Sequence, residues 1–280
     1  MKVIYIAGLG HSGTTLLNQL LTQSSATISL GEVAVMFSPE HMNAYKAKWG
    51  HTTDYCLCSC GKKWSECKFW SELEHLSGLK SSLPVPEKYK ILIDHIRSRH
   101  GDDSILVDSS KSIPAFESML AGARAAGLKT EDCLLVHCVR DVRGFASSHA
   151  SRRKERMSFV DLLRTFNLWL GSNREFDGLR ERHGSEEGIV LYEKLCANPA
   201  AVLNPLLRKV GLTFDNSSGG GLAQESHIAM GNKAFTQRNR DRIKYDMRWF
   251  ADDRIETAYL LHRSARSYNK LLYSRSLGKF

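Results

Sequence analysis

The sequence contains no apolar run of the roughly 18 residues that a membrane-spanning helix requires, so we expect no membrane span. It also leaves no room for a secretory leader, because the first predicted strand begins at Lys2 or Val3. Together these absences predict a cytoplasmic protein. Neither an internal repeat nor a low-complexity tract occurs, and a chain of 280 residues is long enough to bury a sizeable core. We therefore expect one domain over residues 1–280.

Acidic residues are in the minority, since 30 Asp and Glu stand against 39 Lys and Arg and the formal net charge is +9. This balance suits an anionic partner, which could be a nucleic acid, a membrane surface or a polyanionic small molecule. The charge alone does not choose among these partners. The 7 cysteines of a chain expected to be cytoplasmic indicate thiols or metal ligands before disulfides.

A lysine is missing where a nucleoside-triphosphate loop requires one. The apolar run Val3–Ala7 leads into a turn with four residues between Gly8 and Gly13, and a helical pattern follows. This spacing predicts a strand, an anion-binding loop and a helix whose N-terminus faces the anion. Thr14 and Thr15 stand where a Lys would reach the β- and γ-phosphates of ATP or GTP. The loop therefore predicts binding of a single 5′-phosphate.

Strands and helices alternate along most of the chain, which predicts an α/β fold with a parallel central sheet flanked by helices. The predicted strands are 2–7, 28–30, 104–107, 134–139 and 189–192, and the predicted helices are about 13–24, 87–99, 114–127, 158–182, 199–211 and 252–274. Residues 38–87 break this rhythm and hold a cysteine cluster and three of the 5 tryptophans. We expect this stretch to be an insertion that caps the ligand site.

Basic side chains follow two of the predicted strands. Lys111 comes shortly after Val107, and Arg140 directly follows the strand 134–139, with Ser148 eight residues later. Ligands of open parallel sheets bind outside the carboxyl ends of the strands, so these groups should converge with the phosphate loop. A magnesium-dependent NTPase would place an Asp where Arg140 stands, whereas a guanidinium with a hydroxyl suits a phosphate. Two phosphate sites without an obvious metal carboxylate indicate a nucleotide with separate 5′ and 3′ phosphates.

The ordered set of these motifs resembles the sulfotransferases that use 3′-phosphoadenosine 5′-phosphosulfate (PAPS). The segment 10–17 is similar to their 5′-phosphosulfate loop, and Arg140 with Ser148 is similar to their 3′-phosphate clamp. Tyr192 is similar to a tyrosine near the adenine, and the segment 227–233, which begins at His227, resembles a late loop that closes on the nucleotide. The resemblance implies a P-loop-like sulfotransferase fold with these nucleotide-binding residues: Gly10, His11, Ser12, Gly13, Thr14, Thr15, Arg140, Ser148, Tyr192, Gly231, Asn232 and Lys233.

The same resemblance implies in-line transfer of a sulfuryl group to an acceptor hydroxyl or amine. Glu32 is placed like the catalytic Glu of the tyrosylprotein branch, which implies that it removes the acceptor proton. Many relatives carry Arg or Lys where His11 stands, so either a protonated His11 or Lys111 would neutralise charge on the leaving nucleotide. A small-molecule, carbohydrate or peptide acceptor fits this chemistry, and the sequence selects none of them.

A cysteine cluster is the second notable feature of the chain. Cys56, Cys58, Cys60 and Cys67 lie close together in the predicted insertion. Structural zinc needs four such ligands, but the spacing differs from the paired C-x2-C of zinc ribbons. The pattern also resembles bacterial members of the sulfotransferase family. The sequence therefore favours buried thiols or a disulfide here and leaves zinc as the alternative.

Two other functions stay open at the level of sequence. A P-loop kinase or NTPase would share the glycine loop, although the missing Lys and the presence of Arg140 argue against it. A non-catalytic nucleotide- or nucleic-acid-binding module would use basic stretches such as 152–156 and 238–244. These stretches lack interleaved aromatic residues on which bases could stack, so we expect no nucleic-acid partner.

Overall fold

The computed structural model describes residues 1–38, 58–63, 66–77, 82–151, 156–184, 188–214, 226–228 and 243–275. In these ranges a sheet of parallel strands has the order β2-β3-β1-β4-β5. Its strands are β1 (Lys2–Ala7), β2 (Thr27–Gly31), β3 (Ile105–Lys111), β4 (Cys133–Val139) and β5 (Ile189–Leu191). The parallel α/β fold predicted from the alternating pattern is confirmed.

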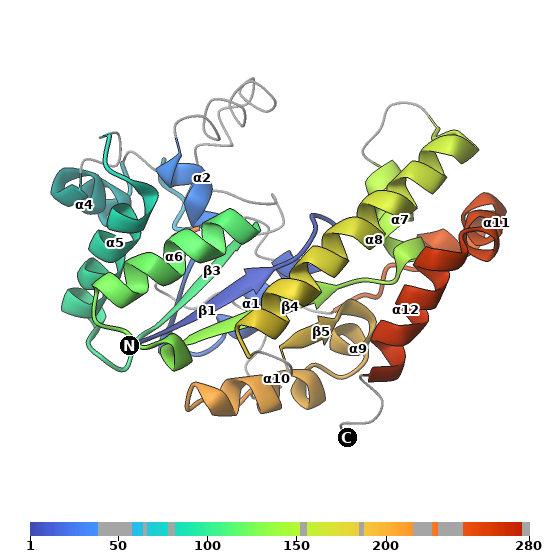
Figure 1. Ribbon diagram of the computed structural model, residues 1–280. Helices are drawn as coiled ribbons and strands as arrows, with labels where there is room; N and C mark the ends of the chain where they lie inside the picture. The colour runs from blue at the N-terminus through green and yellow to red at the C-terminus, as the bar shows by residue number, and fades with distance from the viewer. Residues whose placement is uncertain are drawn as a thin grey trace.

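Helices connect and cover these strands (Figure 1). They are α1 (Thr14–Leu21), α2 (Val33–Phe37), α4 (Lys68–Ser77), α5 (Val85–His100), α6 (Ile113–Ala125), α7 (Val142–Ala150), α8 (Phe159–Arg182), α9 (Tyr192–Ala197), α10 (Pro199–Lys209), α11 (Asp253–Leu261) and α12 (Arg263–Arg275), with short 3-10 helices η3 (Thr130–Asp132) and η5 (Arg248–Ala251). Within the described ranges, no helix combines the length and the apolar character that crossing a membrane demands.

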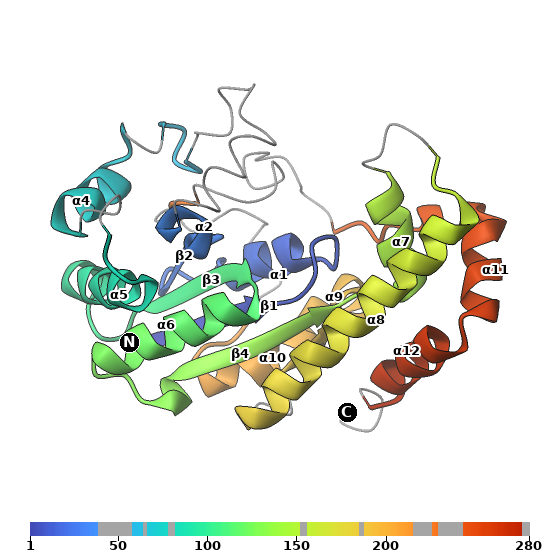
Figure 2. The same ribbon diagram turned by 45° about the horizontal axis from the view of Figure 1, so that its top comes forward.

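The two faces of the sheet carry separate hydrophobic cores because side chains alternate along a strand. Val3 and Tyr5 of β1 join the core that α5 and α6 cover, whereas Ile4 and Ile6 pack with residues of α1 and α10. Figure 2 shows α6 and α8 crossing one face of the sheet while α1 and α10 lie on the other. Helices on both faces explain why the central strands are continuous apolar runs.

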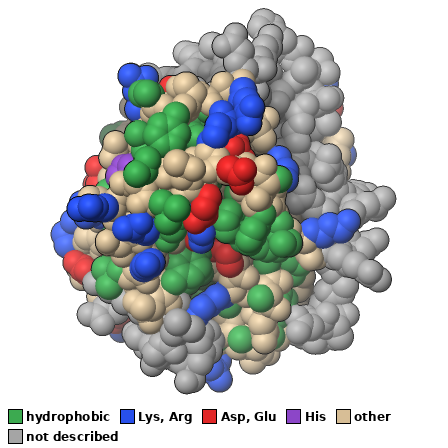
Figure 3. Space-filling view, turned by 90° about the vertical axis from the view of Figure 1, so that its right-hand side faces the viewer, with side chains coloured by type: hydrophobic (Ala, Val, Ile, Leu, Met, Phe, Trp, Pro, Cys, Tyr) green, Lys and Arg blue, Asp and Glu red, His purple; other side chains and the backbone are tan. Residues whose placement is uncertain are grey.

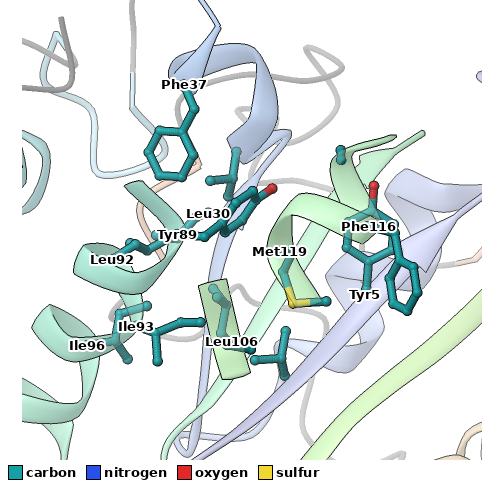
Figure 4. Close-up of a cluster of buried hydrophobic side chains, with 14 of the residues drawn as sticks. Tyr5, Leu30, Phe37, Tyr89, Leu92, Ile93, Ile96, Leu106, Phe116 and Met119 are labelled. Atoms are coloured by element: carbon teal, nitrogen blue, oxygen red, sulfur yellow. The ribbon is translucent and has the colours of Figure 1, made fainter. Parts of the chain in front are cut away.

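The core under α5 and α6 is rich in aromatic residues. Tyr5, Tyr89 and Phe116 lie in it with Leu106 and Met119 (Figure 4). The Tyr5 and Phe116 rings meet edge to face with centroids 5.2 Å apart. The two tyrosines keep their hydroxyl groups hydrogen-bonded toward the carboxyl end of β3, so this core also positions polar groups at the edge where the candidate site lies.

A third cluster joins α7 and α8 to α11 and α12. Leu162, Phe166 and Trp169 of α8 lie at helical spacing and are buried in this cluster. The exposed large hydrophobic residues of the described chain also belong largely to this side: Val160, Leu168, Met247, Phe250, Leu260, Leu261 and Leu271. Figure 3 views this side and shows apolar side chains interspersed with basic and acidic ones.

Two predicted boundaries need correction. The strand predicted at 104–107 continues to Lys111, so Lys111 ends β3 instead of following it in a loop. The predicted helix 252–274 is two helices, because His262 leaves the helical conformation and its Nδ1 accepts a hydrogen bond of 3.2 Å from the Ala265 amide. A side chain that caps the next helix competes with continuation of the first one.

Candidate functional site

The loop between β1 and α1 ends on a glycine that no other residue could replace without strain. Gly13 has φ 92°, and a Cβ atom there would collide with the Tyr192 ring. The first N–H groups of a helix lack partners within the helix, and α1 has no acidic residue in its first turn. The loop therefore presents the partly positive end of α1 to any bound anion.

Two non-glycine residues of the described chain have positive φ angles, namely His11 at 74° and Lys111 at 71°. Such conformations cost on the order of 1–3 kcal/mol and concentrate at functional sites. Both residues are candidate catalytic residues in the sequence. The Gly8 amide donates to the Lys111 carbonyl oxygen over 3.3 Å, which holds the end of β3 against the start of the loop.

His11, Arg140 and Ser148 meet at the carboxyl end of β4. The His11 Nδ1 atom lies 3.2 Å from the Ser148 Oγ, and Arg140 Nη1 donates to the His11 carbonyl oxygen over 3.4 Å. Ser148 lies on α7, which starts directly after β4. The structure thus brings the predicted 5′ loop and the predicted 3′ clamp into direct contact.

Arg140 is buried and held on several sides. Its guanidinium carbon lies 4.6 Å from the centre of the Tyr192 ring, and Trp169 Nε1 donates to its carbonyl oxygen over 2.9 Å. A Cβ atom at Gly144 would lie 2.8 Å from Arg140 Nε, so the glycine makes room for the side chain beside α7. Tyr192, predicted near the adenine, lies against both Gly13 and Arg140.

Asp246 faces Arg140 and was missed by the sequence analysis. Arg140 Nη2 lies 3.0 Å from Asp246 Oδ2, and Arg248 Nη2 lies 2.7 Å from the same oxygen. Hydrogen bonds from Arg248 first, and then from Arg140, hold the pKa of Asp246 well below its usual range. The carboxylate is therefore charged at neutral pH and occupies one edge of the guanidinium.

Glu32 and Lys111 form an ion pair next to the loop. Glu32 directly precedes α2, and its Oε1 contacts the Lys111 Nζ atom. Their side chains are 19% and 21% exposed, so the pair can be reached from solvent. Ser110 Oγ accepts a hydrogen bond of 2.9 Å from the Ala34 amide, which ties α2 to β3 and fixes the position of the pair.

The carboxylates nearest the strand ends are bound by protein groups. Asp108 of β3 accepts hydrogen bonds from the Tyr89 hydroxyl at 2.7 Å and from the Ser110 amide at 2.8 Å. Its burial raises the pKa of this carboxyl to about 6. Asp141 accepts a hydrogen bond of 2.9 Å from the Arg143 backbone amide, which caps the start of α7, and another of 2.9 Å from the Asn269 side-chain amide. The acidic residue after Arg140 therefore has a structural role.

Two buried polar atoms at the site lack a hydrogen-bond partner within the part of the chain that the structure describes. They are the Oγ of Ser12 and the Nε of Arg140. A buried donor without a partner costs about 1–3 kcal/mol. Both belong to groups predicted to bind phosphate, and an oxyanion beside them would supply the missing acceptors. The residues present therefore fit an anionic ligand.

The remaining predicted residues are placed as follows. Gly10 belongs to the loop and Thr15 to α1, and Thr14 is buried at the first position of that helix. The candidates Gly231, Asn232 and Lys233, and also Cys56, lie outside the described residues. The cysteine cluster was predicted to hold buried thiols or a disulfide, and the described cysteines are free thiols: Cys58, Cys60, Cys67, Cys133, Cys138 and Cys196.

Comparisons with known proteins identify a family and a fold. The family model described as "Sulfotransferase family" matches residues 4–216. The solved structure of the sulfotransferase domain from the Synechococcus PCC 7002 olefin synthase is similar, with a TM-score of 0.59 and 18% sequence identity over 95% of this chain and 94% of that chain. At this identity the likeness concerns the fold. No curated protein sequence matches significantly.

Proposed function

The chain belongs to the sulfotransferase family, and we propose that it moves a sulfuryl group from PAPS to an acceptor hydroxyl or amine, releasing 3′,5′-adenosine bisphosphate. The observation that carries the proposal is the contact of His11 in the anion-binding loop with both Arg140 and Ser148. The loop that would hold one phosphate and the clamp that would hold the other lie side by side there. This arrangement matches a nucleotide with phosphates on both its 5′ and 3′ positions.

The 5′ phosphosulfate would lie against the loop. The amide groups at the start of α1 supply donors, and the Ser12 Oγ is a buried hydroxyl that lacks a partner in the described structure. The position after Gly13 holds Thr14 instead of a lysine, so the loop has no side-chain cation that would reach further phosphates. This favours PAPS over ATP.

The 3′-phosphate would lie between Arg140 and Ser148. A guanidinium binds phosphate through charge-assisted hydrogen bonds, and the Ser148 hydroxyl can donate one more. Tyr192 packs against the guanidinium and Gly144 leaves room for it, so little side-chain freedom is lost on binding. Part of the Arg140 charge faces Asp246, and the phosphate would compete with that carboxylate.

The chemical step needs a base and a cation. Transfer forms a bond between the acceptor oxygen or nitrogen and sulfur, and breaks the bond between sulfur and the bridging oxygen to the 5′-phosphate. Glu32 would take the acceptor proton, since it is a partly exposed carboxylate beside the loop. Lys111 would neutralise the charge that develops on the bridging oxygen, because it lies between Glu32 and the start of the loop.

His11 has a different task in this proposal. Its ring contacts Ser148 and its carbonyl oxygen accepts from Arg140, so its described contacts lead toward the 3′ clamp. We assign His11 to coupling the loop with the clamp and Lys111 to the leaving group. The insertion 38–87 would cover the acceptor, and the acceptor itself would be a small molecule, a carbohydrate or a peptide.

The test is a transfer assay with ³⁵S-labelled PAPS and acceptors from each of these three classes. The proposal expects labelled product with at least one acceptor and no product with the Arg140→Ala protein. Phosphoryl transfer from Mg-ATP by the same pure protein, without any use of PAPS, would replace this proposal with the kinase hypothesis.

A further inference from the structure

We infer that Cys58, Cys60, Cys67 and His227 form a structural zinc site that fastens two distant segments to the edge of the sheet. Their potential ligand atoms all lie within 4.8 Å of one another. The site is separate from the proposed sulfuryl transfer, and its test does not depend on that activity. Cys56, a candidate ligand in the sequence, lies outside the described residues, and the four described ligands already complete a tetrahedral set.

The distances fit a tetrahedral zinc ion. Zinc binds sulfur at about 2.3 Å and imidazole nitrogen at about 2.0 Å, so a tetrahedron places sulfur and nitrogen ligands roughly 3.5 Å apart. The His227 Nδ1 atom lies 3.3 Å from the Cys67 Sγ and 3.8 Å from the Cys58 Sγ. Three cysteines and one histidine form a complete ligand set for structural zinc, which leaves no open position for a substrate.

The local backbone around Cys58 and Cys60 is a tight turn that points both sulfur atoms to one place. The Cys58 amide donates to the Lys62 carbonyl oxygen, and the Gly61 amide donates to the Cys58 carbonyl oxygen, both over 2.8 Å. Gly61 has φ 88°, a conformation that favours glycine. Cys67 comes just before α4, and its amide donates to the Lys63 carbonyl oxygen over 2.8 Å.

His227 is held in a defined orientation from both sides. Its amide donates to the Ser29 carbonyl oxygen of β2 over 3.0 Å, and its own carbonyl oxygen accepts from Trp70 Nε1 over 2.8 Å. Its ring stacks on Phe69 with centroids 4.9 Å apart and planes 8° apart. These contacts direct Nδ1 toward the sulfur atoms, as the supporting residues of a metal ligand should.

A disulfide does not explain the cluster. Cys58 and Cys67 are almost completely buried, and all three cysteines are free thiols that surround one histidine nitrogen. Buried polar sulfur and nitrogen atoms converging on one point are stabilised when a cation lies between them. Thiolates and imidazole are ligands that zinc prefers, whereas magnesium and calcium prefer oxygen.

The site has a structural consequence for the rest of the molecule. Residues 58–77 and 226–228 are far apart in the sequence, and the ion would join both to β2, the strand at the edge of the sheet. The Ser59 amide and hydroxyl add bonds of 2.9 and 2.6 Å to Ile228 and Ser226. Because β2 ends just before Glu32, the zinc ion would also stabilise the strand end that positions Glu32.

The experiment measures the metal content of the purified protein by inductively coupled plasma mass spectrometry. We expect one zinc ion per chain in the unmodified protein, in Cys56→Ser and in Cys196→Ser, which is the control outside the cluster. We expect less than a tenth of that zinc in Cys67→Ser and His227→Asn. Full zinc in His227→Asn together with its loss in Cys56→Ser would overturn the assigned ligand set.

A second measurement covers variants that fail to fold. The unmodified protein is stripped with a chelator and reloaded with Co²⁺ alone. For a tetrahedral site with three thiolates, we expect strong visible absorption bands and a thiolate-to-cobalt charge-transfer band. We also expect Co²⁺ to restore the melting temperature, which chelation lowers. The proposal would be overturned if the purified protein contained no zinc and showed none of these bands after loading with Co²⁺. A disulfide between Cys58 and Cys67 in the peptide map of the protein would overturn it as well.

Discussion

The Nδ1 atom of His11 lies 3.2 Å from the Oγ of Ser148, so the anion-binding loop after β1 touches the helix that follows β4. The two residues are 137 positions apart in the sequence. Their contact joins the loop and the clamp, two motifs that are each predicted to bind a phosphate, into one site. The His11 carbonyl oxygen also accepts a hydrogen bond from Arg140, whose guanidinium contacts Tyr192 and Asp246.

Replacement of Ser148 by Ala should weaken binding of 3′,5′-adenosine bisphosphate about tenfold, because one hydrogen bond to a charged phosphate is lost. Binding of 5′-AMP should stay within about twofold, since that nucleotide lacks the 3′-phosphate. Isothermal calorimetry with both nucleotides measures the two values. An equal loss for both nucleotides would show that Ser148 supports the loop through His11 and does not bind the 3′-phosphate.

Replacement of Glu32 by Gln should lower kcat by roughly 10²- to 10⁴-fold, because general-base catalysis contributes about this much. Affinity for 3′,5′-adenosine bisphosphate should change little, since Glu32 contacts Lys111 and not the clamp. The matched control is Glu175→Gln on the exposed side of α8, which should leave both values unchanged. Normal turnover in Glu32→Gln would remove Glu32 as the base.

Asp246→Asn should tighten binding of the bisphosphate, by about fivefold. The Asp246 carboxylate pairs with Arg140 over 3.0 Å and repels a phosphate that approaches the same guanidinium. An uncharged amide keeps the shape but removes the competing charge. Titrations at two salt concentrations measure the effect, which should shrink at high salt. Weaker binding by the variant would mean that Asp246 chiefly orients Arg140.

Asp108 predicts a pH dependence of stability. Its pKa is about 6 in the folded protein and 3.8 in an unfolded chain, so between these values the folded state binds more protons. The free energy of unfolding, taken relative to Asp108→Asn, should therefore fall by about 3 kcal/mol as the pH rises from about 4 to about 6.

Urea unfolding of both proteins across this pH range checks the prediction. Asp103→Asn, which replaces an exposed carboxylate, is the control. Its free energy of unfolding should differ from that of the unmodified protein by an amount that does not change with pH. A difference between the unmodified protein and Asp108→Asn that stays flat, or that rises with pH, would contradict burial of the Asp108 carboxyl as the cause.

The parallel sheet and the loop could be predicted from the sequence because their signals are local. The apolar run before Gly8, the two glycines and the Thr14 that replaces a lysine lie within a few residues of one another. Arg140 and Lys111 could be placed as well, since residues at the ends of parallel strands share one edge. Spacing and strand polarity were sufficient for these features.

Contacts made by tertiary packing could not be predicted in the same way. Nothing near Asp246 in the sequence indicates that it pairs with Arg140, because a carboxylate pairs with whichever cation the fold brings close. His227 likewise was read with the late loop, whereas the structure places it among cysteines some 160 residues earlier. The helix break at His262 depends on a side-chain cap that competes with continuing the helix.

Calorimetric titration with 3′,5′-adenosine bisphosphate, beside 5′-AMP and Mg-ATP, shows whether the site binds two separate phosphates. We expect the bisphosphate to bind far more tightly than the other two, and Arg140→Ala to weaken its binding by about 100-fold. Arg164→Ala, whose side chain is 76% exposed on α8, should bind like the unmodified protein. Preference for Mg-ATP, or bisphosphate binding that survives the loss of Arg140, would contradict the two-phosphate site.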